Sequence, residues 1–409
     1  MQADLGMEII KGGITAVQGF KASGLHCGIK RSRADLALIY TEAEASAAGV
    51  FTQNTVKAAP VILSKKHLSS GRARAVVVNS GNANACTGER GMSDAEKMAE
   101  TAAYALGIKP QEVVVASTGV IGVPLPMDKI QRGIYEAAEK LSSDGGSAAA
   151  EAIMTTDTYP KEFAVRFDLD GVTVTVGGMA KGSGMIHPNM ATMLGFIATD
   201  AAVSPKMLKK ALKYAVDRSF NMITVDGDTS TNDMVVVLAN GLSKNPIIDS
   251  EAPAYFKFLR ALERVCLELA KDIVRDGEGA TKFVEIEVSG ASSVEEARKL
   301  ALSVATSSLV KTALFGEDAN WGRILAACGK TGVLFDPSKV DIFLKSKGGI
   351  EQTARGGMGL PFNEENAARI LAEKEIKIII NFNEGEASAK AWTCDLSYEY
   401  VRINSSYRT

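Results

Sequence analysis

Short apolar runs rich in β-branched residues alternate with longer amphipathic stretches along the whole chain. Runs of the first kind predict strands, whereas apolar residues spaced three and four apart predict helices. In the first half, the stretches Asp94–Leu106 and Met127–Leu141 predict helices. The runs that predict strands there are Leu36–Tyr40, Ala75–Val78 and Val172–Val176. The pattern is typical of a mixed α and β protein.

The second half continues the same alternation. Helices are predicted near Pro205–Arg218, Ala254–Arg275 and Val294–Ala301, and strands at Met234–Ala239, Phe283–Val288 and Ile376–Asn381. No period of roughly 20 to 50 residues recurs, which excludes solenoids and propellers.

Glycine marks the points where strand patterns end. The chain has 38 glycines, and many fall in short polar segments directly after an apolar run. Loops of small polar residues at strand ends are common places for binding and catalytic sites. The segments of this kind are Asn79–Asn82, Ser117–Gly119, Gly177–Gly184 and Asp276–Gly279.

Size and charge limit the classes of function. With 409 residues, 46% of them hydrophobic, the chain can form a large core. Its formal charge is −2, from 46 basic and 48 acidic residues, so nucleic acid is not an expected partner. The start lacks a basic region followed by an apolar stretch, and no run of about 18 apolar residues occurs, so neither secretion nor membrane spanning is expected. We expect a soluble cytoplasmic protein.

Cysteine and histidine are too scarce and scattered for a metal cluster. The five cysteines lie far apart with no CxxC pair, which favours reduced, buried thiols. Only three histidines occur, so few candidates exist for a His-rich metal site or a Ser-His-Asp relay. The acidic segment Asp226–Asp233 resembles a calcium loop, but Thr231 stands where glycine is needed and Val237 where glutamate is needed. We therefore expect no metal, and interpret this segment as a hydrogen-bonded loop near the site.

The densest motif is Gly177–Gly195, which invites comparison with phosphate-binding loops. In a Walker A loop the lysine follows the last glycine, whereas here Lys181 precedes Gly182. A dinucleotide fingerprint also fails, because its third glycine is replaced by His187. Nucleotide binding is therefore disfavoured.

Within this motif, Thr192 lies between a flexible glycine-rich segment and an apolar strand pattern. A threonine there is usually an ordinary strand residue, and the residues alone favour that interpretation. The alternative is an N-terminal nucleophile, in which cleavage after Ala191 frees the α-amino group of Thr192 as its own base. Such an amine has a pKa of about 8, so part of it is unprotonated near neutral pH.

Five blocks of this sequence, in matching order, resemble the ornithine acetyltransferases of arginine biosynthesis. The resemblance spans nearly the whole chain, and its most specific block ends in Ala191-Thr192-Met193-Leu194. The blocks are Asn79–Ala85, Ala116–Gly122, Lys181–Leu194, Gly227–Asp233 and Asp276–Lys282.

The resemblance implies self-cleavage between Ala191 and Thr192, which gives an α chain of residues 1–191 and a β chain of residues 192–409. Thr192 would then form an acetyl-enzyme, and Thr118 and Gly119 would form the oxyanion hole. The resemblance also implies a set of substrate contacts whose types suit a buried zwitterion. These residues are Thr155, Lys181, Thr192, Glu278, Asn404 and Thr409.

The fold implied is α+β: a four-layer αββα sandwich of the aminopeptidase and ornithine acetyltransferase type, built from both chains. The implied assembly is an α2β2 heterotetramer. The implied reaction is a ping-pong transfer of acetyl from N2-acetyl-L-ornithine to L-glutamate. No cofactor is expected, although some family members also use acetyl-CoA as donor.

Two other classes of function remain open. An N-terminal-nucleophile aminopeptidase or amidase would share the cleavage and the acyl-enzyme but pass the acyl group to water. A non-enzymatic metabolite-binding module would show neither cleavage nor turnover.

Overall fold

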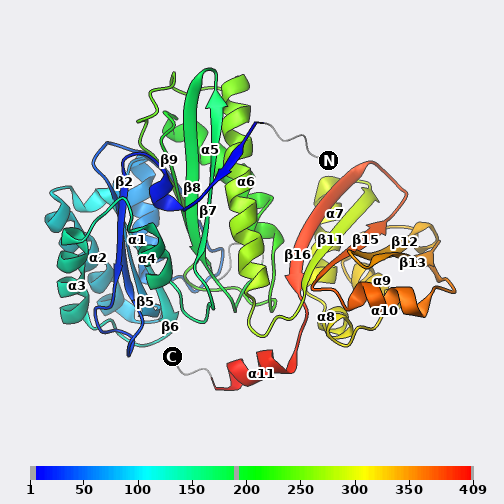
Figure 1. Cartoon of the computed structure of the whole chain (residues 1–409). Coiled ribbons are helices and arrows are strands. Elements are labelled where there is room, and N and C mark those ends of the chain that lie inside the picture. Colours follow the sequence, from blue (N-terminus) through cyan, green and yellow to red (C-terminus); the bar gives the residue numbers. More distant parts are fainter. Residues whose placement is uncertain (1–5, 188–192, 407–409) are drawn as a thin grey trace.

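The computed structural model describes residues 6–187 and 193–406. Two β-sheets lie face to face at the centre of the sandwich (Figure 1). We call the six-stranded one the first sheet. In spatial order its strands are β1 (Glu8–Ile10), β7 (Lys161–Leu169), β8 (Val172–Lys181), β9 (Leu194–Thr199), β10 (Met234–Ala239) and β4 (Ser46–Phe51).

The second sheet has four strands, and β5 and β6 run parallel in it. Apolar residues of the two facing sheets share one core, with Val76 and Ala116 on one side and Phe196 and Val236 on the other. The strands are β2 (Phe20–Leu25), β3 (Leu36–Thr41), β5 (Ala75–Asn82) and β6 (Val113–Val120).

Helices cover the outer faces of both sheets and complete the four layers (Figure 1). The second sheet is covered by α1 (Ala59–His67), α2 (Gly88–Leu106) and α3 (Met127–Glu139). The first sheet is covered by α5 (Pro205–Asp217) and α6 (Pro253–Arg275), while α4 (Gly146–Ala152) contributes to the core between the sheets. The predicted α+β sandwich is confirmed.

A third sheet, which the sequence analysis did not set apart, forms a lobe beside the sandwich (Figure 1). In spatial order its strands are β14 (Met358–Gly359), β13 (Gly349–Arg355), β12 (Asp341–Ser346), β15 (Glu375–Asn381), β11 (Phe283–Ala291) and β16 (Ala387–Cys394). Its helices are α7 (Val294–Ala305), α8 (Ser308–Phe315), α9 (Trp321–Gly329) and α10 (Glu364–Leu371).

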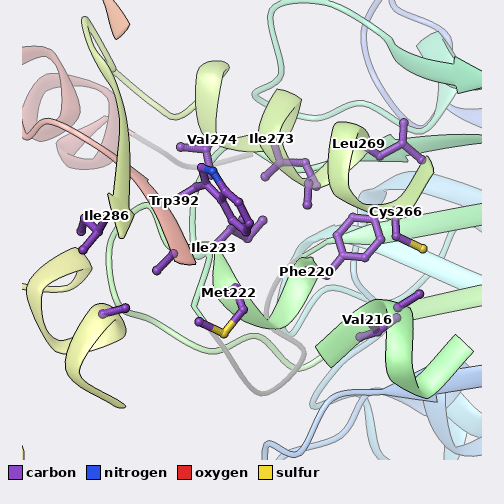
Figure 2. Packing of buried hydrophobic residues seen from close by; sticks show 14 of the residues in the cluster. Val216, Phe220, Met222, Ile223, Cys266, Leu269, Ile273, Val274, Ile286 and Trp392 are labelled. Atoms are coloured by element: carbon purple, nitrogen blue, oxygen red, sulfur yellow. The ribbon is translucent and has the colours of Figure 1, made fainter. Parts of the chain in front are cut away.

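The lobe and the sandwich share apolar packing. Figure 2 shows Trp392 of β16 beside Ile273 and Val274 of α6 and close to Ile223. The Trp392 side chain is almost fully buried there, with 4% of the residue exposed. Because one apolar cluster extends from α6 into the third sheet, loops from the lobe can be held firmly against the sandwich.

After β16 the chain returns toward the sandwich along α11 (Tyr398–Ser405) (Figure 1). Short 3₁₀ helices join other elements at Ile14–Ala16, Leu68–Ser70, Pro110–Glu112, Phe220–Met222 and Pro337–Lys339. Among the residues that the structure describes, no helix is both long enough and apolar enough to span a membrane.

Candidate active site

The parallel strands β5 and β6 end side by side and place two of the glycine-rich segments next to each other. Gly81 pairs with Gly119 in the ladder. Gly119 has a φ of +129°, and a Cβ on it would lie 2.2 Å from the Gly81 carbonyl carbon. Both facts require glycine at this position. The strand end therefore brings the Gly119 backbone and the Thr118 hydroxyl to the same edge.

A pocket of about 510 Å³ opens at this edge. This volume falls in the usual range for small-molecule sites. Six residues that the sequence analysis assigned to the site line it: Thr118, Gly119, Thr155, Lys181, Glu278 and Asn404. The structure thus brings together side chains from β6, β8, α11 and two loops.

Three of the assigned positions are not placed. Ala191, Thr192 and Thr409 lie outside the described residues, so their roles stay predictions. The next residue after Thr192, Met193, is described, and its backbone N–H donates to Asp233 Oδ1 at 2.9 Å.

Lys181 is the last residue of β8 and reaches into the pocket while only 3% of the residue is exposed. Its ammonium group donates to Thr155 Oγ1 at 2.6 Å and to Thr118 Oγ1 at 3.4 Å. Burial lowers the pKa of Lys181, and the nearby Asp157 carboxylate opposes that shift. Lys181 therefore links the two threonines that the sequence analysis assigned to different roles.

Behind Lys181 lies a buried network of charges that the sequence analysis did not single out. Lys161 Nζ contacts Asp157 Oδ1 at 2.7 Å and Asp276 Oδ2 at 2.6 Å. All three side chains are at most 3% exposed. Buried charges are tolerated only when they are paired and hydrogen-bonded.

Glu278 lies on the loop after α6, directly opposite the glycine segment that follows β8. Its backbone N–H donates to the Ser183 carbonyl at 2.9 Å. Its carboxylate accepts a hydrogen bond from Asn404 Nδ2 at 2.8 Å. A Cβ on Gly184 would lie 2.4 Å from Glu278 Cδ. The loop and α11 thus hold the Glu278 carboxylate close to the main chain of the glycine segment.

The acidic segment Asp226–Asp233 forms a loop at the pocket, as the sequence analysis expected. Asp226 accepts backbone N–H bonds from Met185 at 2.5 Å and Ile186 at 2.9 Å. Asn232 donates to the carbonyls of Ala83 and Ser117. The loop thus fastens β10 and the glycine segment to the second sheet. In the part of the chain that is described, no group of three or more potential ligands could hold a metal ion.

Asp233 closes this loop and is fully buried. Burial raises the pKa of Asp233 well above its usual value. One carboxyl oxygen, Oδ1, receives the Met193 N–H, and no described residue donates to the other, Oδ2. The carboxyl group thus anchors the first described residue after the predicted cleavage point.

Sequence reasoning gave no role to Asp157, Asp233 or Gly184, although Asp233 and Gly184 lie in segments that it placed near the site. Asp157 stands two residues after Thr155, and Gly184 lies inside the densest glycine motif, so their positions in the sequence gave a weak signal. Only the folded arrangement shows that Asp157 faces Lys181 and that Gly184 faces Glu278.

Comparison with known proteins gives the family. The model of the ArgJ family matches residues 21–409. The arginine biosynthesis bifunctional protein ArgJ of Symbiobacterium thermophilum is 58% identical over 406 residues, which cover 98% of this chain and 100% of the relative. The protein of the same name from Caldanaerobacter subterraneus subsp. tengcongensis is 54% identical, covering 98% of this chain and 100% of the relative.

A solved structure of ornithine acetyltransferase from Mycobacterium tuberculosis, complexed with ornithine, is 46% identical to part of this chain. It covers 44% of this chain and 98% of its own, with a TM-score of 0.42. The family assignment rests on the matches that span nearly all of the sequence. The chain therefore belongs to the ArgJ family, the acyltransferases of arginine biosynthesis.

Proposed function

We propose that the chain cleaves itself between Ala191 and Thr192 and then transfers acetyl from N2-acetyl-L-ornithine to L-glutamate through Thr192. The observation that carries this proposal is the pocket in which Thr118, Lys181 and Glu278 converge. It supplies a hydroxyl donor, an ammonium and a carboxylate to one small molecule. Met193, the residue after Thr192, donates its backbone N–H to the buried carboxyl group of Asp233.

In the first half-reaction, the Thr192 hydroxyl oxygen attacks the acetyl carbonyl carbon, and the free α-amine of Thr192 takes the hydroxyl proton. The Thr118 hydroxyl and the Gly119 N–H stabilise the negative oxygen that develops. The bond between the acetyl carbon and the ornithine nitrogen then breaks. The α-ammonium returns its proton to that nitrogen, so ornithine leaves and an acetyl ester remains on Thr192.

In the second half-reaction, the α-amine of glutamate attacks the same carbonyl carbon. The ester bond breaks, Thr192 recovers its proton, and N-acetylglutamate leaves. Lys181 suits a substrate carboxylate and Glu278 suits a substrate ammonium. N-acetylornithine carries both groups, because only its α-nitrogen is acetylated. Acetyl-CoA is a further candidate donor, since the relatives are named bifunctional.

The test begins with the intact mass of the wild type beside Thr192→Ala. We expect two fragments from the wild type, one of which begins at Thr192, and one uncut chain from the variant. N-acetylornithine alone should then add one acetyl group to the fragment that begins at Thr192. A wild type that transfers acetyl without being cut would overturn the free-amine mechanism.

The two rival functions give different products in the same experiment. An amidase would release free acetate at the rate at which donor is consumed, whether or not glutamate is present. A binding module would leave the donor intact. Supplying acetyl-CoA in place of N-acetylornithine tests whether it is a second donor.

We further propose that the cleaved chains form an α2β2 assembly in the cytoplasm. The cytoplasmic location is supported by the family's role in amino-acid biosynthesis, which draws on free metabolites. The α2β2 assembly is what the resemblance of the five sequence blocks implies. Sedimentation equilibrium of the cleaved wild type should give a mass of two α and two β chains. The mass of a single αβ pair would contradict the assembly.

A further inference from the structure

The ammonium group of Lys181 is shared among three oxygens. It donates to Thr155 Oγ1 at 2.6 Å and to Thr118 Oγ1 at 3.4 Å, and it faces Asp157 Oδ2 at 3.8 Å as an ion pair. An ammonium has three hydrogens and accepts none. Two of them are donated to the threonine oxygens. Asp157 Oδ2 at 3.8 Å lies beyond hydrogen-bond distance, so the third hydrogen can be donated to a substrate carboxylate.

This arrangement fixes the direction of one hydroxyl hydrogen. Because Lys181 donates to the Thr118 oxygen, that oxygen is an acceptor on the side facing Lys181. The hydrogen of Thr118 must then point elsewhere, and Thr118 lines the pocket. A neutral amine at Lys181 could instead accept this hydrogen, which would remove the donor from the pocket.

The charge on Lys181 therefore decides whether the oxyanion hole is complete. The charged or titratable groups that face Lys181 are Asp157, Lys161, Glu278 and Asp233, together with Lys30 of the neighbouring loop. The positive charges of Lys161 and Lys30 disfavour the charged form of Lys181, and so does the burial of Lys181. An ionised carboxylate is needed to offset all three effects.

Asp157 is better suited to this task than Asp233. Burial opposes ionisation of Asp157, but the ammonium groups of Lys181 and Lys161 outweigh it and hold its pKa well below the usual value. Burial instead raises the pKa of Asp233 well above its usual value, so its carboxyl group ionises less readily than that of Asp157.

Backbone hydrogen bonds fix the Asp157 carboxylate in place. The Gly182 N–H donates to Oδ1 at 2.7 Å, and the Thr155 N–H donates to Oδ2 at 3.0 Å. Lys161 Nζ holds the same Oδ1 at 2.7 Å. The carboxylate thus sets the main chain on both sides of the Lys181 contact, next to Lys181 itself and at Thr155.

We propose that Asp157 is a positioning residue: paired with Lys161, it keeps Lys181 an ammonium, and Lys181 in turn directs the Thr118 hydroxyl hydrogen toward the acetyl oxygen. The inference rests on the proposed function, since it needs acetyl transfer in this pocket. It assigns to Lys181 a role in the oxyanion hole beside that of holding a carboxylate.

The test is the pH dependence of acetyl-enzyme formation from N-acetylornithine, measured in single turnovers by intact mass. The acid limb belongs to the α-amine of Thr192, which must lose a proton. We assign the alkaline limb to Lys181. In Asp157→Asn this limb should move at least about one pH unit lower. At pH values above the alkaline limb, the rate of acetyl-enzyme formation should be about 10²-fold lower, the loss typical of removing one oxyanion donor.

A double variant separates charge from shape. Asp157→Asn with Lys161→Met removes one charge of each sign around Lys181, so the alkaline limb should return part of the way toward the wild type. If Asp157 merely supports the fold, Asp157→Asn and the double variant should each lose the same factor in rate at every pH, with no shift of the alkaline limb. That result would overturn the proposal. Asp200→Asn is the matched control, because Asp200 is buried and accepts the Thr175 N–H at 2.8 Å but forms no ion pair with a lysine among the described residues.

Lys181→Arg gives an answer even if Asp157→Asn does not fold. A guanidinium stays charged throughout the accessible pH range, so the alkaline limb should disappear. A limb that persists would overturn the inference. A wild type that forms no acetyl-enzyme would instead refute the proposed function, so the two failures are distinguishable.

Discussion

The space around the Glu278 carboxylate is limited by a residue without a side chain. A Cβ at position 184 would lie 2.4 Å from both Cδ and Oε2 of Glu278. We therefore expect Gly184→Ala to displace the carboxylate and to raise the KM for N-acetylornithine by about 10- to 100-fold, the cost of one charge-assisted hydrogen bond. Steady-state kinetics measures this change, and the melting temperature should change little.

Gly329→Ala is the control for this substitution. Gly329 ends α9, and apart from its chain neighbours and the backbone of its own helix, no described atom lies within 4 Å of a Cβ placed there. Equal effects of the two variants on KM would show that Gly184 does not limit the space around the carboxylate. A large loss of stability in Gly184→Ala alone would show that the glycine serves the fold instead.

The same contact shows why part of the site could not be predicted from the sequence. Lys181, Thr118 and Glu278 were assigned because their blocks resemble a family, and the structure gathers them in one pocket. Gly184 matters only because the loop after α6 packs against it, and that approach depends on the whole sandwich. An apolar pattern or a motif carries no information about such a distance.

At the scale of elements, apolar periodicity predicted the interiors of the helices and strands well but some of their ends poorly. Met234–Ala239 has the same bounds as β10. The helix predicted from Asp94 begins earlier, as α2 starts at Gly88. Its first turns contain Gly91, where a Cβ would lie 2.0 Å from Thr87 Oγ1. Tight packing thus requires a glycine within the helix, where glycine is otherwise disfavoured.

In the third sheet, buried and partly exposed side chains alternate along the strand β11. In β11 the residues Val284 and Ile286 are buried, while Glu285 and Glu287 point to the other face. There each glutamate pairs with Lys377 of β15 and Lys390 of β16. Such cross-strand ion pairs stabilise neighbouring strands modestly.

The ion pairs make the stability of this lobe depend on pH. Burial works against ionisation of Glu285, but hydrogen bonds from Lys390, Trp392 and Lys377 outweigh it and lower the pKa to about 2. The low pKa of folded Glu285 stabilises the fold at pH values above about 4.3, the pKa of a glutamate in the unfolded chain. This stabilisation is lost as the pH falls toward 2. Glu285→Gln should therefore lose less stability between pH 7 and about pH 3 than the wild type.

Because the Glu285 side chain is partly exposed to solvent, we discount the effect to about 1 kcal/mol. Urea unfolding at the two pH values measures it. Glu295→Gln is the control, since Glu295 pairs with Lys299 at the surface of α7, with 79% of its side chain exposed. If Glu285→Gln kept the full acid dependence of the wild type, the ion pairs would not be its source.

At the scale of the whole molecule, the predicted cleavage point falls between adjacent strands of the first sheet. The β8 strand lies before it and β9 after it, and the two pair in antiparallel register from Val176 with Thr199 to Lys181 with Leu194. On the other side, β10 pairs with β4, which again precedes the cleavage point. The strands β9 and β10 of the later piece are thus enclosed between strands of the earlier one.

We therefore predict that the two pieces of the cleaved wild type elute together in gel filtration without denaturant, at the volume of uncut Thr192→Ala. Separation would require two backbone ladders to break and α6 to leave β7 and β8, against which it packs. Each such step exposes buried apolar surface and unpaired backbone groups. Pieces that separate under these conditions would contradict the shared sheet, whereas pieces that separate only in denaturant would show that noncovalent contacts alone hold the cleaved enzyme together.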